Sequence, residues 1–149
     1  PYNITDSASG ILDTINFSHI FSFYNSISGS YYIEIKHDQC TETWSRSGGE
    51  GLTNDSTIYN LDFTSSESQA FGSNLALIDS TPLYFGILSG DVNQDGFINL
   101  ADVITIYNDA GNFVTGYKVT DVNGDNIVDA TDVSLVDNNA FNSVTVIRP

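Results

Sequence analysis

The first 88 residues alternate between apolar and polar side chains in short runs, and Gly, Asn and Ser separate the runs. A period of two, together with frequent β-branched and aromatic residues, is typical of β-strands with one buried face. Helical periodicity of useful length is absent from this part of the sequence. The pattern favours an antiparallel β-sandwich of the immunoglobulin-like or prealbumin-like kind. Its strands are predicted at residues 10–17, 19–24, 31–37, 41–44, 57–63 and 84–88.

After residue 88 the pattern changes, because two oxygen-rich loops begin thirty positions apart, at Asp91 and at Asp121. Ca²⁺ takes six to eight oxygen ligands, and a short loop can supply them from positions 1, 3, 5, 7, 9 and 12. Position 7 contributes a backbone carbonyl, so its residue type is free. At position 6, Gly96 and Asn126 are residue types that readily adopt the positive φ of a sharp bend. The predicted calcium ligands are Asp91, Asn93, Asp95, Phe97, Asn99 and Asp102 in loop 1, and Asp121, Asn123, Asp125, Ile127, Asp129 and Asp132 in loop 2.

The residues around these loops predict a helix after each loop but none before it. The segments that lead into the loops, residues 84–90 and 115–120, are rich in β-formers or interrupted by Gly, which disfavours a helix. Apolar residues at helical spacing predict that a helix begins near position 9 of each loop. Position 8 is apolar in both loops, which indicates a short two-stranded contact between the loops through Ile98 and Val128.

A loop followed by a helix, repeated once, with Asp at position 12 where Glu is usual, resembles the dockerin family over about residues 89–147. The resemblance implies two loop–helix (F-hand) repeats with two calcium ions, and a cohesin module as partner. The pairs before position 12, Leu100-Ala101 and Ala130-Thr131, depart from the Ser-Thr-like pair of many cohesin-binding dockerins. The metal sites therefore carry over more directly than the partner does. Residues that recur thirty positions later are Asp91, Val92, Asn93, Asp95, Asp102, Val103, Asn108, Ala110, Asn112, Val114 and Thr115.

By pattern the chain divides into a β-module at residues 1–88 and a dockerin-like module at residues 89–149. The β-module is similar to modules that precede dockerin-type repeats at the C-termini of large secreted bacterial surface proteins. No Pro/Ser-rich spacer separates the two parts, so we expect one rigid α+β unit. The resemblance to those modules rests on residues 31–37, 42–45 and 60–64.

The balance of charge narrows the class of partner and the location. The chain has 149 residues, of which 4 are basic and 19 acidic, and its formal net charge is −15. Such a charge argues against nucleic acid or an anionic membrane as partner, and no apolar run is long enough to enter a bilayer. Weak calcium sites stay filled in the millimolar calcium outside cells. We therefore expect an extracellular or cell-surface protein, secreted and with its leader or upstream part removed.

Two groups of side chains outside the loops admit a chemical role. Cys40 is the only cysteine, so no internal disulfide forms, and His37 precedes it by three residues. The pair admits a nucleophilic or transition-metal site, but the strand pattern before it favours His37 as a residue at a strand end and Cys40 as a packed loop residue. Trp44 with Tyr31 and Tyr32 admits a sugar-binding platform, although a role in the core is favoured.

Three functions of different classes stay open. The first is a non-enzymatic, calcium-stabilised structural subunit of a surface fibre or filament, a homopolymer joined through strand edges or through terminal segments 11–15 and 144–147. The second is a dockerin-type adaptor that docks into a cohesin-like partner and anchors a secreted protein. The third, an enzyme such as a glycoside hydrolase, is disfavoured because no catalytic constellation is present and the Asp pairs are assigned to calcium. The sequence favours the fibre subunit by a small margin.

Overall fold

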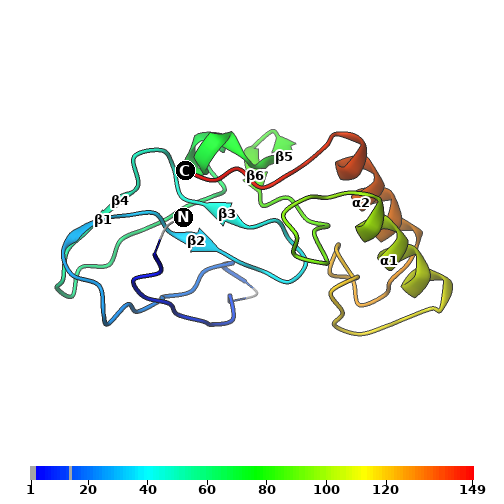
Figure 1. Cartoon of the computed structure of the whole chain (residues 1–149), viewed down its shortest axis with the longest axis horizontal. Helices are drawn as coiled ribbons and strands as arrows, with labels where there is room; N and C mark the ends of the chain where they lie inside the picture. The colour runs from blue at the N-terminus through cyan, green and yellow to red at the C-terminus, as the bar shows by residue number, and fades with distance from the viewer. Residues whose placement is uncertain (1–2, 14) are drawn as a thin grey trace. The chain divides into compact units, whose positions relative to one another are not determined.

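The computed structural model describes residues 3–13 and 15–149 (Figure 1). The chain forms two compact units, and each contains two stretches of sequence. Unit 1 comprises residues 1–31 and 51–59, and unit 2 comprises residues 32–50 and 60–149. This grouping differs from the boundary expected at residue 88, which stays a prediction.

The strands are short and pair only two by two among the described residues. β2 and β3 are antiparallel, with Glu34 opposite Trp44 and Ile35 opposite Thr43, and they fall within two of the predicted strands. The structure is therefore a small α+β fold with short antiparallel sheets. The pairs are β1 (Gly29–Tyr31) with β4 (Glu50–Leu52), β2 (Glu34–Ile35) with β3 (Thr43–Trp44), and β5 (Ala76–Ser80) with β6 (Leu83–Gly86); two 3₁₀ turns, η1 (Glu67–Gln69) and η2 (Phe71–Ser73), precede β5.

The structure does not confirm the predicted β-sandwich. No strand forms in segment 57–63 or in the described parts of segments 10–17 and 19–24, and Thr14 lies outside the described residues. The apolar side chains that should face a core are exposed instead: Ile11 is 87% and Ile15 82% exposed. Phe17 has a φ of 50°, which is outside the strand region. Alternation alone was insufficient, because a strand also needs a partner and a second sheet to cover its apolar face.

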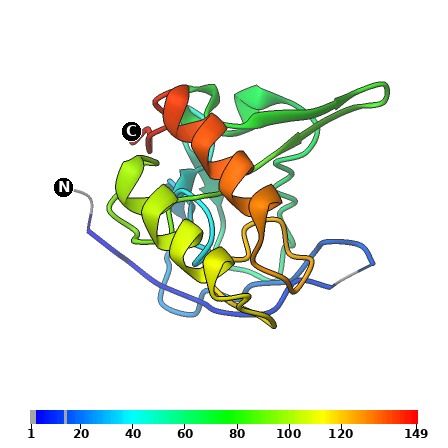
Figure 2. The same cartoon turned by 90° about the vertical axis from the view of Figure 1, so that its right-hand side faces the viewer.

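The β5–β6 hairpin was predicted only in part. The strand predicted at residues 84–88 overlaps β6, whereas its partner β5 has two adjacent apolar residues, Leu77 and Ile78, and gives no clean alternation. A register shift between Leu77 and Asp79 accounts for this, because the irregularity breaks the period of two. Figure 2 shows the hairpin extending away from the two helices of the same unit.

Two helices follow the oxygen-rich loops, as the sequence predicts. They are α1 (Leu100–Gly111) and α2 (Ala130–Phe141), and each is preceded by a capping box. In α1 the Asn99 side chain accepts a hydrogen bond from a backbone N–H of the first turn, and the Asp102 side chain accepts one from the Asn99 N–H. This arrangement satisfies amides that have no partner inside the helix. The helices lie side by side and run in opposite directions (Figure 2).

The main hydrophobic cluster lies in unit 2, between the helices and the loops, and it repeats with the sequence. Ile98 matches Val128, and Ile106 matches Val136, each pair thirty residues apart, and all four are at most 2% exposed. Burying each such side chain contributes about 1.5–3 kcal/mol. Around them pack Val92, Val103, Ala110, Val114, Val133, Ala140 and Val144.

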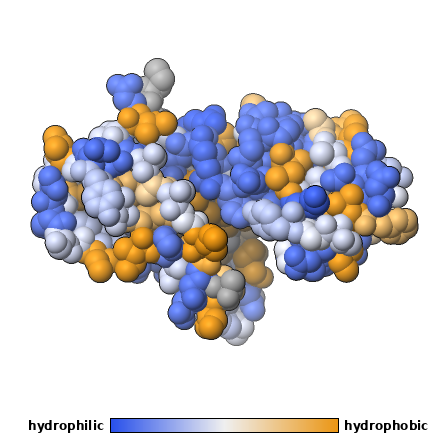
Figure 3. Space-filling model, turned by 90° about the horizontal axis from the view of Figure 1, so that it is seen from below, coloured by the Kyte–Doolittle hydropathy of each residue, from blue (hydrophilic) through white to orange (hydrophobic). Residues whose placement is uncertain are grey.

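Outside this cluster many large apolar side chains are exposed. On the face drawn in Figure 3, orange apolar residues lie in separate patches among blue polar ones. Scattered apolar residues are usual on protein surfaces and do not by themselves mark a binding site. Any proposed contact surface therefore needs a further argument.

Candidate metal centre

The carboxylate at position 1 of each loop organises the bend that follows it. Asp91 Oδ1 accepts a hydrogen bond from Asp95 N at 3.1 Å, and Oδ2 accepts one from Gly96 N at 3.0 Å. In loop 2 the Asp121 side chain accepts the equivalent bonds from Asp125 N at 3.1 Å and Asn126 N at 2.9 Å. Both carboxylates are buried. Position 1 therefore holds the chain in a tight turn with its oxygens inside.

The Asp at position 12 closes each loop. Asp102 Oδ1 accepts from Asn93 N at 3.3 Å and Oδ2 accepts from Asn99 N at 3.0 Å. Asp132 Oδ1 accepts from Asn123 N at 3.1 Å, and its Oδ2 accepts from the N–H of position 9 at 2.9 Å. Both side chains are fully buried. The first helical turn is thus tied to the start of its own loop.

The side chains at positions 3, 5 and 9 are held by hydrogen bonds from backbone N–H groups two residues later in the chain. Asn93 Oδ1 accepts from Asp95 N at 2.8 Å, and Asp95 Oδ1 accepts from Phe97 N at 2.9 Å. Loop 2 repeats both bonds at Asn123 and Asp125. At position 9 the side chains of Asn99 and Asp129 cap the helices, and the hydrogen bonds from Thr131 lower the pKa of Asp129.

Negative charge is concentrated at these loops. Burial raises the pKa of the Asp91 carboxyl, the N–H of Gly96 opposes this rise, and the charges of Asp102 and Asp95 add to it. In the described part of the chain, the salt bridges of Lys and Arg go to Glu34, Glu42 and Glu50, and none goes to a loop carboxylate. Buried carboxylates without a basic partner are costly unless a cation joins them.

The donor chemistry fits calcium, although the carboxylates are not gathered around one point. The predicted ligands are carboxylate, amide and backbone oxygens, which suit a hard cation. Among the described residues, however, no group of three or more His, Cys, Asp or Glu side chains is arranged so that it could hold a metal ion. The carboxylates at positions 1 and 12 accept backbone amides of their own loop instead. The assignment of the twelve ligands stays a prediction.

The expected contact between the two loops is wrong. Ile98 N donates to Val144 O at 3.0 Å, and Val128 N donates to Val114 O at 2.9 Å. Each loop therefore pairs with the segment that follows the helix of the other repeat, and Phe97 with Thr145 forms one such isolated bridge. The antiparallel helices explain the exchange, because each helix ends beside the other repeat's loop.

Two glutamines that hold the loops in place are not signalled by any pattern in the sequence. Gln39 is buried, and its Nε2 donates to the backbone carbonyls of Lys118 and Asp121 at 2.7 and 2.6 Å. Gln94 Nε2 donates to Cys40 O at 3.1 Å. A glutamine in a turn has no periodicity or motif, so only the fold shows that it reaches a loop.

The other candidate groups do not form a catalytic site. Cys40 Sγ lies 3.8 Å from His37 Nδ1, but burial raises the pKa of the Cys40 thiol to about 11, so it is protonated at neutral pH. Trp44 is half-buried and its indole N–H donates to Glu42. Tyr32 packs edge-on against Phe71, with 5.9 Å between ring centroids. These contacts are typical of structural packing.

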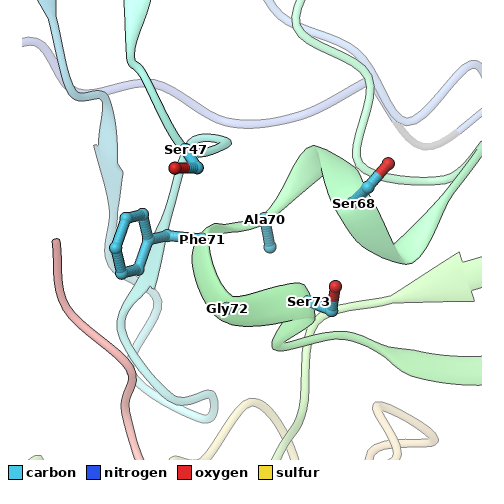
Figure 4. Close-up of a pocket in the computed structure, with 6 residues that line it drawn as sticks. All are labelled: Ser47, Ser68, Ala70, Phe71, Gly72 and Ser73. Carbon is cyan, nitrogen blue, oxygen red and sulfur yellow. The ribbon is translucent and has the colours of Figure 1, made fainter.

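A pocket of about 380 Å³ lies at the 3₁₀ turns of unit 2 (Figure 4). Its lining contains three serines and no ionisable side chain, so it offers neither a general base nor a charged ligand. In Figure 4 the Phe71 ring lies on the opposite side of the pocket from the Ser68 hydroxyl. The full lining is Ser47, Ser68, Ala70, Phe71, Gly72 and Ser73.

Of three comparisons with known proteins, the one with protein families found a match, and it covers both oxygen-rich loops. Neither the curated proteins nor the solved structures contain a match to this chain. Within the described residues, no helix has the length and apolar character needed to cross a membrane. Domains of the matching family typically bind calcium, are non-catalytic, and occur in secreted or cell-surface proteins. Residues 89–140 match the family model of the Dockerin type I domain, and a dockerin-like domain is therefore present in this part of the chain.

Proposed function

We propose that this protein is a non-enzymatic adaptor of the dockerin type, which docks into a cohesin-like partner outside the cell. The observation that carries the proposal is the match to the Dockerin type I domain, which spans both oxygen-rich loops, all of α1 and all but the last residue of α2. A domain of this family implies a cohesin partner. The region before the domain would then be the part that the adaptor carries or positions.

We further propose that the two loops bind one Ca²⁺ each through the twelve oxygen donors predicted above. When bound, calcium supplies the positive charge that the buried carboxylates at positions 1 and 12 lack. The chain contributes preformed bends at positions 1 to 6 and a helix N-terminus that fixes position 12. Because Asp102 and Asp132 accept amide hydrogen bonds, ion binding has to compete with these bonds, which favours moderate affinity.

The outer faces of the two helices differ, and this difference points to α1 as the docking face. On α1, Leu100, Ile104 and Tyr107 follow one another at helical spacing and are 68%, 50% and 66% exposed. Their counterparts on α2, thirty residues later, are the exposed residues Ala130, Ser134 and Asp137. An apolar stripe that includes an aromatic residue is the kind of surface that supplies binding energy. The internal repeat thus preserves the core but not the exterior.

Matched substitutions on the two helices test the docking face. Binding of a panel of cohesin modules to the full chain would be measured by calorimetry with calcium and with chelator. Ile104→Asp should weaken binding about tenfold or more, because it places a charge inside the apolar stripe. Ser134→Asp introduces the same charge at the equivalent position of α2 and should leave the affinity within about twofold. Binding that survives chelation, or equal effects of the two variants, would contradict the proposal.

The fibre subunit favoured by the sequence has less support than the adaptor. No comparison supports a homopolymer, and one of the two expected donor segments is engaged within its own chain. Val144 O accepts from Ile98 N, and Val146 N donates to Gly96 O at 2.9 Å. The other segment, residues 11–15, contains Thr14, which is outside the described residues.

A further inference from the structure

A turn outside the dockerin-like domain packs against the entry to loop 1. Gly90 N, next to Asp91, donates to Gln39 O at 2.7 Å, and Thr41 N donates to Leu88 O at 2.8 Å. Cys40 and Ser89 form an isolated antiparallel bridge. The entry turn, defined here as residues 37–41, is therefore fixed in unit 2 by its backbone.

The same turn reaches the entry to loop 2 through one buried side chain. Both donors of the Gln39 amide are used, since Nε2 donates to Lys118 O at 2.7 Å and to Asp121 O at 2.6 Å. Asp121 is position 1 of loop 2. The Gln39 side chain thus fixes the backbone at the residue whose carboxylate organises the whole bend.

Loop 1 obtains the same contact from within itself. Gln94, at position 4, donates from Nε2 to the backbone carbonyl of Asp91, its own position 1. Position 4 of loop 2 is Gly124, which has no side chain to make this bond. A glutamine amide therefore contacts the position 1 carbonyl in both loops, and in loop 2 it comes from the entry turn.

We propose that Gln39 is a positioning residue for loop 2 and takes the place of the amide that Gly124 lacks. This inference rests on the proposed calcium binding. Without the Gln39 amide, the carbonyl of Asp121, a buried residue, loses a donor, and the position 1 carboxylate is held less firmly. Loss of one such bond at a preformed site corresponds to about a tenfold loss of affinity. The loss should fall on loop 2 and spare loop 1.

The test uses the full chain in two backgrounds that leave one loop intact. Asp95→Ala disables loop 1 and Asp125→Ala disables loop 2, and calcium dissociation constants are measured by calorimetry. Gln39→Met keeps the length of the side chain but removes both donors. It should raise the dissociation constant of loop 2 about tenfold and change that of loop 1 by less than about twofold.

A rescue separates positioning from general stability. Gln94 has a φ of 58° and Gly124 a φ of 78°, so a glutamine at position 124 can adopt the backbone that position 4 already has in loop 1. Adding Gly124→Gln to Gln39→Met should recover most of the lost affinity. Gly124→Ala introduces the same backbone cost without the amide and should not.

Four results would overturn the inference, and they are distinguishable. Unchanged affinity of loop 2 in Gln39→Met, while the parent chain binds two ions, defeats the role of Gln39 alone. Equal losses at both loops, or rescue by alanine as good as by glutamine, would show a merely structural effect. A parent chain that binds no calcium would defeat the proposed function, and this inference with it.

Discussion

At the scale of single residues, the chain uses carboxylates in two different ways. The aspartates at positions 1 and 12 of the loops are buried without a salt bridge to a basic side chain. Glu42, in contrast, has a bidentate partner: Arg148 Nε donates to Oε1 at 2.7 Å and Nη2 to Oε2 at 3.1 Å. Burial opposes ionisation of Glu42, but the hydrogen bonds from Arg148 and Trp44 outweigh it and lower its pKa to about 2. This pair links the C-terminal segment to the residue before β3.

The Glu42 pair makes a contribution to stability that depends on pH. Because the folded-state pKa is lowered from 4.5 to about 2, the contribution is complete above pH 4.5 and is lost as the pH falls toward 2. Glu42→Gln should lower the free energy of unfolding by about 1 kcal/mol at pH 7. Urea unfolding of both proteins at pH 7 and pH 2.5 would measure this.

The difference between the two proteins should shrink at the lower pH, because Glu42 is then protonated in the unfolded parent, whereas in the folded parent, with a pKa of about 2, it is only partly protonated. Other acids titrate equally in both and cancel in the comparison. A difference that stays constant from pH 7 to pH 2.5 would show that the loss at position 42 is one of packing and not of charge.

At the scale of elements, the two helices contribute to the hydrophobic core of unit 2, and each does so through one buried face. Ile106 is fully buried on the inner face of α1, whereas Ile104, two positions away, is half exposed. The inner positions keep their apolar character in both repeats, while the outer ones do not. The buried core residues and the proposed docking face therefore lie on different sides of α1.

Two alanine substitutions in α1 separate these roles. Ile106→Ala should lower the free energy of unfolding by about 3 kcal/mol, because it leaves a cavity in the buried cluster. Ile104→Ala, the matched control, should cost less than about 0.5 kcal/mol. Chemical denaturation in saturating calcium would measure both, and similar costs for the two variants would mean that the inner face has been assigned wrongly.

An element is predictable from the sequence when the residues that stabilise it lie close together along the chain. The loops and helices are set by residues within one turn of each other, such as Asp102 bonding to Asn99 N, and their positions were predicted correctly. The sandwich was not, because strand pairing depends on distant partners that alternation does not identify. Gln39 was missed for the same reason, since its bond to Asp121 spans 82 residues.

At the scale of the whole molecule, residues outside the range matched by the dockerin model also contact its first loop. The C-terminal strap, residues 145–149, lies against loop 1, where Val146 N and Thr145 Oγ1 both donate to Gly96 O at 2.9 and 2.8 Å. Asn74 Nδ2 also donates to Thr145 O at 3.1 Å. The family match ends at residue 140, so these contacts lie beyond the matched region.

Removal of the strap should therefore affect the two loops unequally. A chain that ends at residue 144 loses both bonds to Gly96 but keeps the equivalent bond in loop 2, from Gly116 N to Asn126 O. Its calcium affinity should fall about fivefold or more at loop 1 and change little at loop 2. Calorimetry in the single-loop backgrounds would measure this, and equal losses would contradict a local role of the strap.

The central claim is that both oxygen-rich loops bind calcium and thereby hold the dockerin-like domain ready for its partner. The most direct measurement is a calorimetric titration of calcium into the full chain after chelation, for the parent and for the Asp102→Ala and Asp132→Ala variants. The account predicts two ions per chain for the parent and one for each variant. A stoichiometry below two in the parent, or two ions retained in either variant, would contradict it.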